Sequence, residues 1–261
     1  MLRSINELKG YDLVAVDGEI GSVEQFYFDD ERWALRYVVV VNTGGWLSGR
    51  QVLISPFSVT EIDRDDRKLY ITLTKNQVEQ SPNIDTHKPV SRQMEAAYSD
   101  FYGYPYYWGS PFLWGADERP ILSLQRTATV MSASVEPVTV VTETGQLVTE
   151  DVHLRSTEEV SSYNISATDS DIGHVEDFIV EDDNWKIRYL AIDTTNWWPG
   201  KKVIVSPQWI SSIDWAMNKV NINLTCEEIK ESPAYDISKV LSRDYERELH
   251  RHYGQPAYWT D

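Results

Sequence analysis

The sequence predicts a mainly β protein in which two small antiparallel β-barrels, each followed by short α-helices, are related by a pseudo-two-fold axis. The first observation behind this prediction is a duplication, because one half of the chain matches the other when it is displaced by about 150 residues. A period this long indicates a duplicated domain, since solenoid and propeller repeats span only about 20–50 residues. The matched pairs include Gly21 and Gly173, Phe26 and Phe178, Trp33 and Trp185, Ser55-Pro56 and Ser206-Pro207, and Tyr107-Trp108 and Tyr258-Trp259.

The second observation is the density of strand signals in each repeat. Residues 69–73 and their counterparts 220–224 alternate apolar and polar side chains with a period of two, as a half-buried strand does. Residues 23–28 and 33–41 flank a short polar turn and predict a hairpin, and the second repeat shows the same pattern. Five or six short strands per repeat favour a small closed barrel or a sandwich.

Helical signals follow the strands in both repeats. Thr74 with Gln77, and Thr225 with Glu228, fit the capping box at the start of a helix. A second helix is expected from Ser91 and from Ser242. In the first repeat we expect the buried stripe of this helix to consist of Met94, Ala97, Tyr98 and Phe101.

The expected organisation is a first repeat over residues 1–108, a connector over 109–153 and a second repeat over 154–261. The connector is rich in Ser, Thr, Val and Glu after residue 126. Long segments without secondary structure are uncommon inside compact domains, so we expect a partly ordered linker. The alternative is that residues 138–141 add an edge strand to one barrel.

Composition narrows the classes of function. The net charge is −17, and phosphate binding needs clustered Lys and Arg, so nucleic acid is not an expected partner. Cys226 is the only cysteine, which excludes a disulfide framework and a thiolate zinc site. No apolar run approaches the roughly 18 residues of a membrane helix, and the start lacks a signal-peptide core. We therefore expect a cytoplasmic protein without membrane insertion.

Three motifs, present in each half, resemble the PRC-barrel family. In the first half they are residues 17–26, the strand 33–40 and the ending Ile54-Ser55-Pro56, and in the second half 169–178, 185–190 and Val205-Ser206-Pro207. Gln25 stands where the second repeat carries the usual acidic residue, Asp177. The family includes the cytoplasmic domain of the photosynthetic reaction-centre H subunit and the C-terminal domain of ribosome maturation factor RimM, which bind other proteins. The tandem arrangement is similar to stand-alone bacterial PRC-barrel proteins.

Catalytic and metal sites find little support in the sequence. Glu246 and His250 share a helix face and invite a metal hypothesis, with Asp244 and His252 nearby, but the counterparts of the two histidines, Ser99 and Phe101, are not ligands. The chain lacks a Gly-rich phosphate loop, a nucleophile elbow and a Cys-His pair. We therefore expect no catalytic residues, no metal site and no cofactor.

Loop aromatics are the candidate interaction residues, since Trp and Tyr are enriched at protein interfaces. They are Trp46, Trp197, Trp198, Tyr107, Trp108, Tyr258 and Trp259. Because the aromatic tail ends both repeats, we expect each tail to pack across the other barrel, as in a fused homodimer.

The function expected from the sequence is a non-catalytic protein–protein interaction or assembly module whose partner is another protein, with a homo-oligomer left open. The alternative is a small-molecule or metal-binding protein that uses the groove between the repeats. An RNA- or ribosome-associated factor is disfavoured by the acidic charge.

Overall fold

The structure, a computed structural model, describes residues 1–41, 51–82, 90–122, 139–141, 147–149, 153–194, 201–237 and 239–259. It contains two compact units. The N-terminal unit comprises Leu8–Ser156 and Asp183–Trp185. The C-terminal unit comprises Met1–Glu7, Thr157–Asp182 and Lys186–Asp261. The mainly β fold class is confirmed, because each unit is built on a seven-stranded sheet.

The sheet of the N-terminal unit has the strand order β5-β4-β3-β2-β7-β6. Its two longest strands form the predicted hairpin, in which β-branched and aromatic residues dominate. Neighbouring strands in this order are joined by backbone hydrogen bonds, and β10 pairs in addition with β3. The bounds are β2 (Asp12–Ala15), β3 (Gly18–Asp29), β4 (Ala34–Val41), β5 (Gln51–Ile54), β6 (Val59–Asp63), β7 (Lys68–Ile71) and β10 (Leu154–Ser156).

The sheet of the C-terminal unit repeats this order as β14-β13-β12-β11-β16-β15, and β1 pairs with β12 off the path. Phe178 and Leu190 lie opposite each other on β12 and β13, Tyr189 points to the other face, and all three are fully buried. The bounds are β1 (Leu2–Ser4), β11 (Asn164–Ser166), β12 (Asp171–Glu181), β13 (Ile187–Asp193), β14 (Lys202–Val205), β15 (Ile210–Asp214) and β16 (Lys219–Ile222).

Neither sheet is purely antiparallel, which corrects the sequence prediction. β2 runs parallel to β7, and β11 runs parallel to β16. Between the members of each pair the chain passes through the rest of its sheet, so no tight hairpin constrains their direction. Alternation within a strand reports which face is buried and carries no information on the direction of the neighbouring strand.

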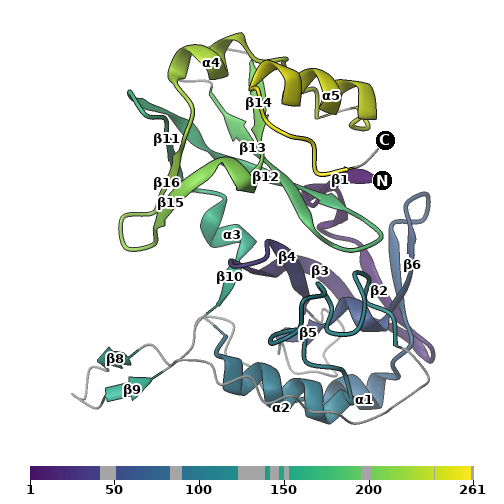
Figure 1. Cartoon of the computed structure of the whole chain (residues 1–261). Coiled ribbons are helices and arrows are strands. Elements are labelled where there is room, and N and C mark those ends of the chain that lie inside the picture. Colours follow the sequence, from purple (N-terminus) through teal and green to yellow (C-terminus); the bar gives the residue numbers. More distant parts are fainter. Residues whose placement is uncertain are drawn as a thin grey trace. The chain divides into compact units, whose positions relative to one another are not determined.

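Short helices cover part of each sheet (Figure 1). Both predicted capping boxes are confirmed, at Thr74 before α1 (Lys75–Glu79) and at Thr225 before α4 (Cys226–Glu231). The second helices are α2 (Arg92–Tyr102) and α5 (Arg243–His252). Remaining short elements are η1 (Asn6–Leu8), η2 (Pro56–Ser58), α3 (Thr157–Val160) and η3 (Pro207–Trp209).

The buried face of α2 differs from the predicted apolar stripe. Tyr98 is buried as expected, but Phe101 is 43% exposed and Ala97 is also exposed. Arg92, Glu95 and Ser99 are buried in their place. An apolar periodicity count cannot detect such a face, because the side chains that it buries are polar and are compensated by hydrogen bonds.

The first strand of each repeat belongs to the unit formed by the other repeat. β1 pairs antiparallel with β12, where Leu2 lies opposite Glu181. β10 pairs in the same way with β3, where Leu154 lies opposite Asp29. Each unit is therefore completed by a strand from the other half of the sequence, so the two repeats exchange their first strands.

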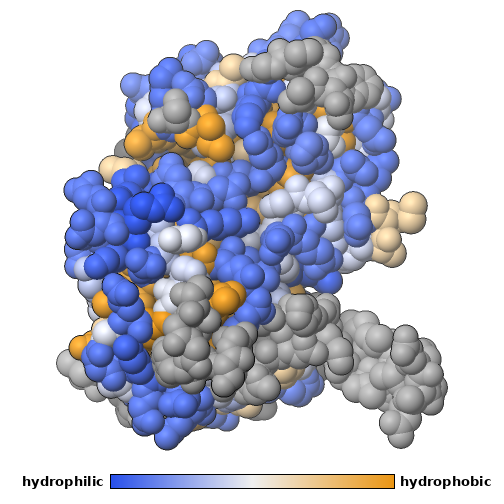
Figure 2. All heavy atoms as spheres, turned by 180° about the vertical axis from the view of Figure 1, so that it is seen from behind, coloured by the Kyte–Doolittle hydropathy of each residue, from blue (hydrophilic) through white to orange (hydrophobic). Residues whose placement is uncertain are grey.

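In the connector, β8 (Thr139–Val141) and β9 (Leu147–Thr149) form a separate two-stranded sheet. The alternative expectation, that residues 138–141 add an edge strand to one barrel, is therefore wrong for β8, which pairs with β9. Hydrophilic residues dominate the face in Figure 2, where apolar residues form small, separate patches. Across the described ranges, no helix has the length and apolar character needed to span a membrane.

Candidate functional site

A buried carboxylate on α2 organises the polar interior of the N-terminal unit. Glu95 is 1% exposed, and its Oε1 accepts a hydrogen bond of 2.5 Å from the hydroxyl of Tyr107. Its Oε2 lies 2.8 Å from Nη1 of Arg92. Burial raises the pKa of Glu95 to about 7, against the lowering influence of Arg92 and of the Tyr107 hydrogen bond. The carboxyl group is thus held by partners within its own unit.

The same arrangement recurs in the C-terminal unit. Glu246 on α5 is 1% exposed and accepts hydrogen bonds from the hydroxyls of Tyr258 at 2.7 Å and Tyr189 at 2.9 Å. Nη1 of Arg243 lies 2.9 Å from its Oε2. We call these two clusters the twin networks. The corresponding residues of the N-terminal unit are Glu95, Tyr107, Tyr37 and Arg92, in the same order.

The aromatic tails lie against arginines in the twin networks or next to them. The guanidinium of Arg36 is 3.6 Å from the ring centre of Tyr107, and that of Arg188 is 4.0 Å from the ring centre of Tyr258. Arg92 likewise lies over Trp108, and Arg243 over Trp259. These are cation–π contacts, which favour ordered rings. Each tail therefore packs on the helix of its own repeat, whereas the sequence had led us to expect packing across the other barrel.

The structure places four of the seven predicted interaction residues. Tyr107 is 5% exposed and serves the interior, whereas Trp108, Tyr258 and Trp259 are half-buried. The remaining residues, Trp46, Trp197 and Trp198, lie outside the described residues.

Beside the twin networks, His250 stands where the first repeat has Ser99. Nε2 of His250 is 2.9 Å from the hydroxyl of Tyr189, and Nδ1 is 2.9 Å from the carbonyl oxygen of Pro256. Burial lowers the pKa of His250. His252 instead contacts the carbonyl oxygen of Glu228 at 2.6 Å. Among the described residues, no group of three or more His, Cys, Asp or Glu side chains is arranged to hold a metal ion.

The exchanged strands are held by matching polar contacts. Ser4 on β1 donates a hydrogen bond to Asp177, and Ser156 on β10 donates one to Gln25, the residue aligned with Asp177. The preceding arginines bind aligned aspartates, Arg3 to Asp182 at 3.4 Å and Arg155 to Asp30 at 3.0 Å. We call the edges of β12 and β3 that receive these strands the strand slots. One slot contains a buried acid where the other contains a neutral amide.

Replacing Asp177 by asparagine is expected to flatten the pH dependence of stability. Burial raises the pKa of Asp177 from 3.8 to about 6, although hydrogen bonds from Ser4 and two backbone amides oppose the shift. The folded state therefore binds the proton of Asp177 more tightly than the unfolded chain does. The stability gained from this protonation is complete below pH 3.8 and is lost as the pH rises through about 6. The twin slot already works with the neutral Gln25.

The measurement is the free energy of urea unfolding of wild type and Asp177→Asn at pH 4.5 and 7.5. We expect the variant to gain stability relative to wild type at the higher pH. A stability difference that does not change with pH would show that Asp177 titrates in its ordinary range.

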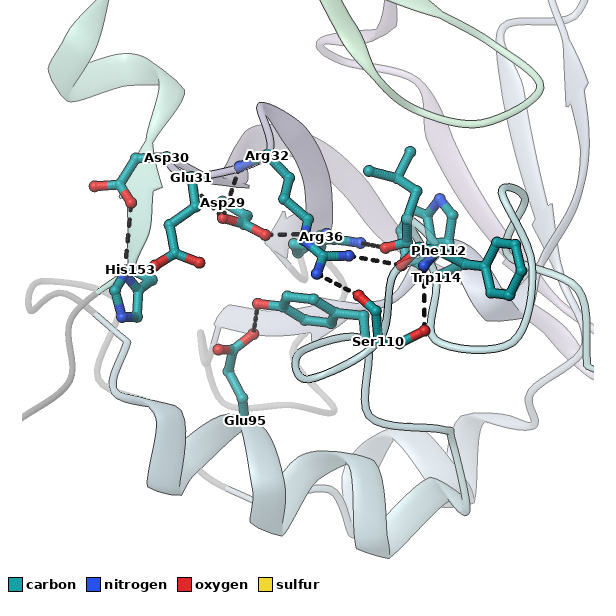
Figure 3. Close-up of polar contacts among 12 residues, drawn as sticks. Asp29, Asp30, Glu31, Arg32, Arg36, Glu95, Ser110, Phe112, Trp114 and His153 are labelled. Carbon is teal, nitrogen blue, oxygen red and sulfur yellow. Dashed lines mark hydrogen bonds and ion pairs between the residues drawn. The ribbon is translucent and has the colours of Figure 1, made fainter. Parts of the chain in front are cut away.

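The first part of the connector is clamped onto the β3–β4 turn of the N-terminal unit (Figure 3). Arg32 donates to the carbonyl oxygens of Ser110 at 2.5 Å and Phe112 at 2.6 Å. Arg36 donates to the carbonyl oxygen of Leu113 at 2.8 Å and pairs with the buried Asp29 at 3.0 Å. These bonds order a segment that carries no helix or named strand.

A cavity lies between Arg36 and α2 in the N-terminal unit. Its lining includes Arg36, Ser99, Tyr104 and Trp114, and its volume of about 10 Å³ has room for a single water molecule. The cavity is therefore too small for a metabolite.

Sequence reasoning missed Glu95, Arg92 and Arg243, and it considered Glu246 only as a possible metal ligand. Glu95 and Glu246 occupy matching positions in the repeats, and so do Arg92 and Arg243. Their recurrence was the available signal, but charged residues on a short helix are usually assigned to its solvated face.

A model of the PRC-barrel domain matches residues 2–78 and 165–221 of the chain. No curated protein matches the chain.

Proposed function

This chain belongs to the PRC-barrel family, and from that premise we propose that it is a non-catalytic module through which another protein binds or assembles. The observation that carries the proposal is the segment 109–122, which Arg32 and Arg36 hold at residues 110–113 and which presents apolar side chains to solvent. Phe112 is 46% exposed, Ile121 52% and Leu122 47%. Binding residues commonly lie on loops held by a rigid scaffold, and this segment has that arrangement.

The hydrogen bonds from Arg32 and Arg36 support binding, because a segment that is already ordered loses less conformational entropy when a partner binds. Trp114, only 1% exposed, anchors the segment, and its indole nitrogen donates to the carbonyl oxygen of Asn184 at 2.8 Å. Phe112 and Gly115 also form an isolated β-bridge. A partner would therefore meet apolar side chains on an ordered backbone.

The buried acids support a structural role over catalysis. A raised carboxyl pKa is a feature of many active sites, but structural networks raise it as well. Glu95, Glu246 and Asp177 are each bonded to several groups of the protein itself. Their hydrogen-bonding capacity is used within the fold, which is how buried charges are normally accommodated.

The test is a quantitative crosslinking pull-down from the native host. The bait is the full chain, and the variant carries Phe112→Ser, Ile121→Ser and Leu122→Ser together. We expect a defined partner whose recovery falls about tenfold or more in the variant, since central apolar contacts dominate interface energies. Met217→Ser is the matched control, because Met217 is a 71% exposed apolar residue in the other unit.

Equal recovery by wild type, triple variant and control would contradict the proposed surface. A further bait with Trp197→Ala and Trp198→Ala tests the tryptophans predicted from the sequence. Loss of the partner in that bait alone would move the binding face to these two tryptophans. Enrichment of no protein above background would contradict the interaction role itself.

The proposal keeps the cytoplasm as the setting and does not include RNA. A net charge of −17 opposes phosphate binding, which depends on clustered basic residues.

A further inference from the structure

The two exchanged strands are chemically interchangeable. β1 and β10 have the same sequence, Leu-Arg-Ser. In both slots the arginine binds an aspartate, Asp182 or Asp30, and the serine donates to a side-chain oxygen two residues before its cross-strand neighbour. A slot thus recognises the tripeptide through backbone pairing and these two side chains, whichever segment supplies it.

The hinge after β1 is long enough to serve either slot. On β3, β10 lies beside Tyr27 and β2 lies beside Ser22, five residues away along the same edge. That distance is about 17 Å at ~3.3 Å per residue. Ser4 and Asp12 are eight residues apart, so residues 5–11 can span up to about 26 Å. The hinge is therefore long enough for β1 to reach the slot on its own repeat, so its length is compatible with two pairings.

Strand β1 is also well suited to leave its slot. It spans only Leu2–Ser4 and pairs with β12 at three positions, so few backbone hydrogen bonds oppose its displacement. Its arginine pair with Asp182 is partly solvated, with side-chain exposures of 20% and 28%. Short strands of this kind exchange between identical copies when the same contacts can form in either arrangement.

We propose that the slot on β12 is the place where a second copy of this chain joins, by seating its own residues 1–5 there in place of the resident strand. The incoming strand pairs with β12 at the same three backbone positions. Its Arg3 binds Asp182, and its Ser4 donates a hydrogen bond to Asp177, as in the resident strand. The contacts within each slot are conserved, and only the chain that supplies the strand changes. This proposal does not rest on the partner surface at residues 112, 121 and 122.

A charge exchange between positions 3 and 182 tests it on the full chain. One variant carries Arg3→Glu and the other Asp182→Arg, so each alone places like charges in its own slot. When the variants are mixed, opposite charges meet only if each copy receives the strand of the other. We expect mixed dimers by native mass spectrometry, at least about tenfold more abundant than dimers of either variant alone.

The matched control carries both substitutions in one chain, which restores opposite charges within the copy and should give no more dimer than wild type. Isotopically light and heavy wild-type chains, unfolded and refolded together, provide a second measurement free of substitutions. There we expect heavy–light dimers whose fraction rises with protein concentration. The proposal is overturned if mixed variants and refolded wild type stay monomeric, or if dimers form equally whatever charges occupy positions 3 and 182.

Discussion

Replacing Asp29 by alanine is expected to destabilise the protein by about 3–5 kcal/mol, because it leaves a buried arginine without its counter-ion. Asp29 and Arg36 are both 1% exposed, and Oδ2 of the acid lies 3.0 Å from Nη2 of the guanidinium. Oδ1 of Asp29 also accepts hydrogen bonds from the backbone of Glu31 at 2.9 Å and Arg32 at 3.2 Å. The substitution therefore removes both the charge balance and the anchor of the β3–β4 turn.

The twin repeat provides the control for this prediction. Glu181 and Arg188 form the aligned ion pair, but their side chains are 19% and 15% exposed. Water compensates a partly solvated charge, so Glu181→Ala should cost no more than about 1 kcal/mol. Urea unfolding monitored by circular dichroism measures both variants. An equal loss of stability in Asp29→Ala and Glu181→Ala would show that burial does not determine how much the ion pair contributes to stability.

Replacing Trp185 by alanine is expected to cost about 3–5 kcal/mol, the range for removal of a buried indole. Trp185 is 4% exposed, and its carbonyl oxygen accepts a hydrogen bond of 2.9 Å from the amide of Leu35 in the N-terminal unit. Its φ is +60°, a left-handed conformation that alanine tolerates no better. The loss of stability therefore reports lost packing and not relief of strain.

Trp33 is the matched control, because it occupies the aligned turn position with a φ of +55°. Its ring is only half-buried and stacks on Phe28 at 5.3 Å. We expect Trp33→Ala to cost less than half as much as Trp185→Ala in the same denaturation experiment. An unchanged stability in Trp185→Ala would contradict the burial of its indole.

Local features of both repeats were predictable from the sequence. The capping boxes at Thr74 and Thr225 form as predicted, with side chain and backbone bonded in both directions. Gly103 is the left-handed C-cap of α2, with a φ of +69°, as is common for a glycine after a helix. These features involve residues close together in the chain, so a short sequence window contains the groups that interact.

The polar interior was not predictable by the same means. The periodicity of α2 pointed to Phe101, whereas the structure buries Glu95 in that helix. A carboxyl group can occupy such a position only because Arg92 and Tyr107 compensate its burial. Arg92 shares the helix, but Tyr107 comes from the tail beyond it, and its approach depends on the path of the chain after Gly103.

The duplicated β architecture, the hairpins and the helix caps were determined by the sequence alone. The duplication is found by comparing the two halves, and the turn residues and capping pairs lie close together in the chain. Which strand completes which sheet was decided only by the tertiary structure. Two identical Leu-Arg-Ser segments meet two equivalent slots, so local chemistry is degenerate between them. The structure shows β1 on β12 and β10 on β3, and each of these pairings joins segments far apart in the sequence, which no short window compares.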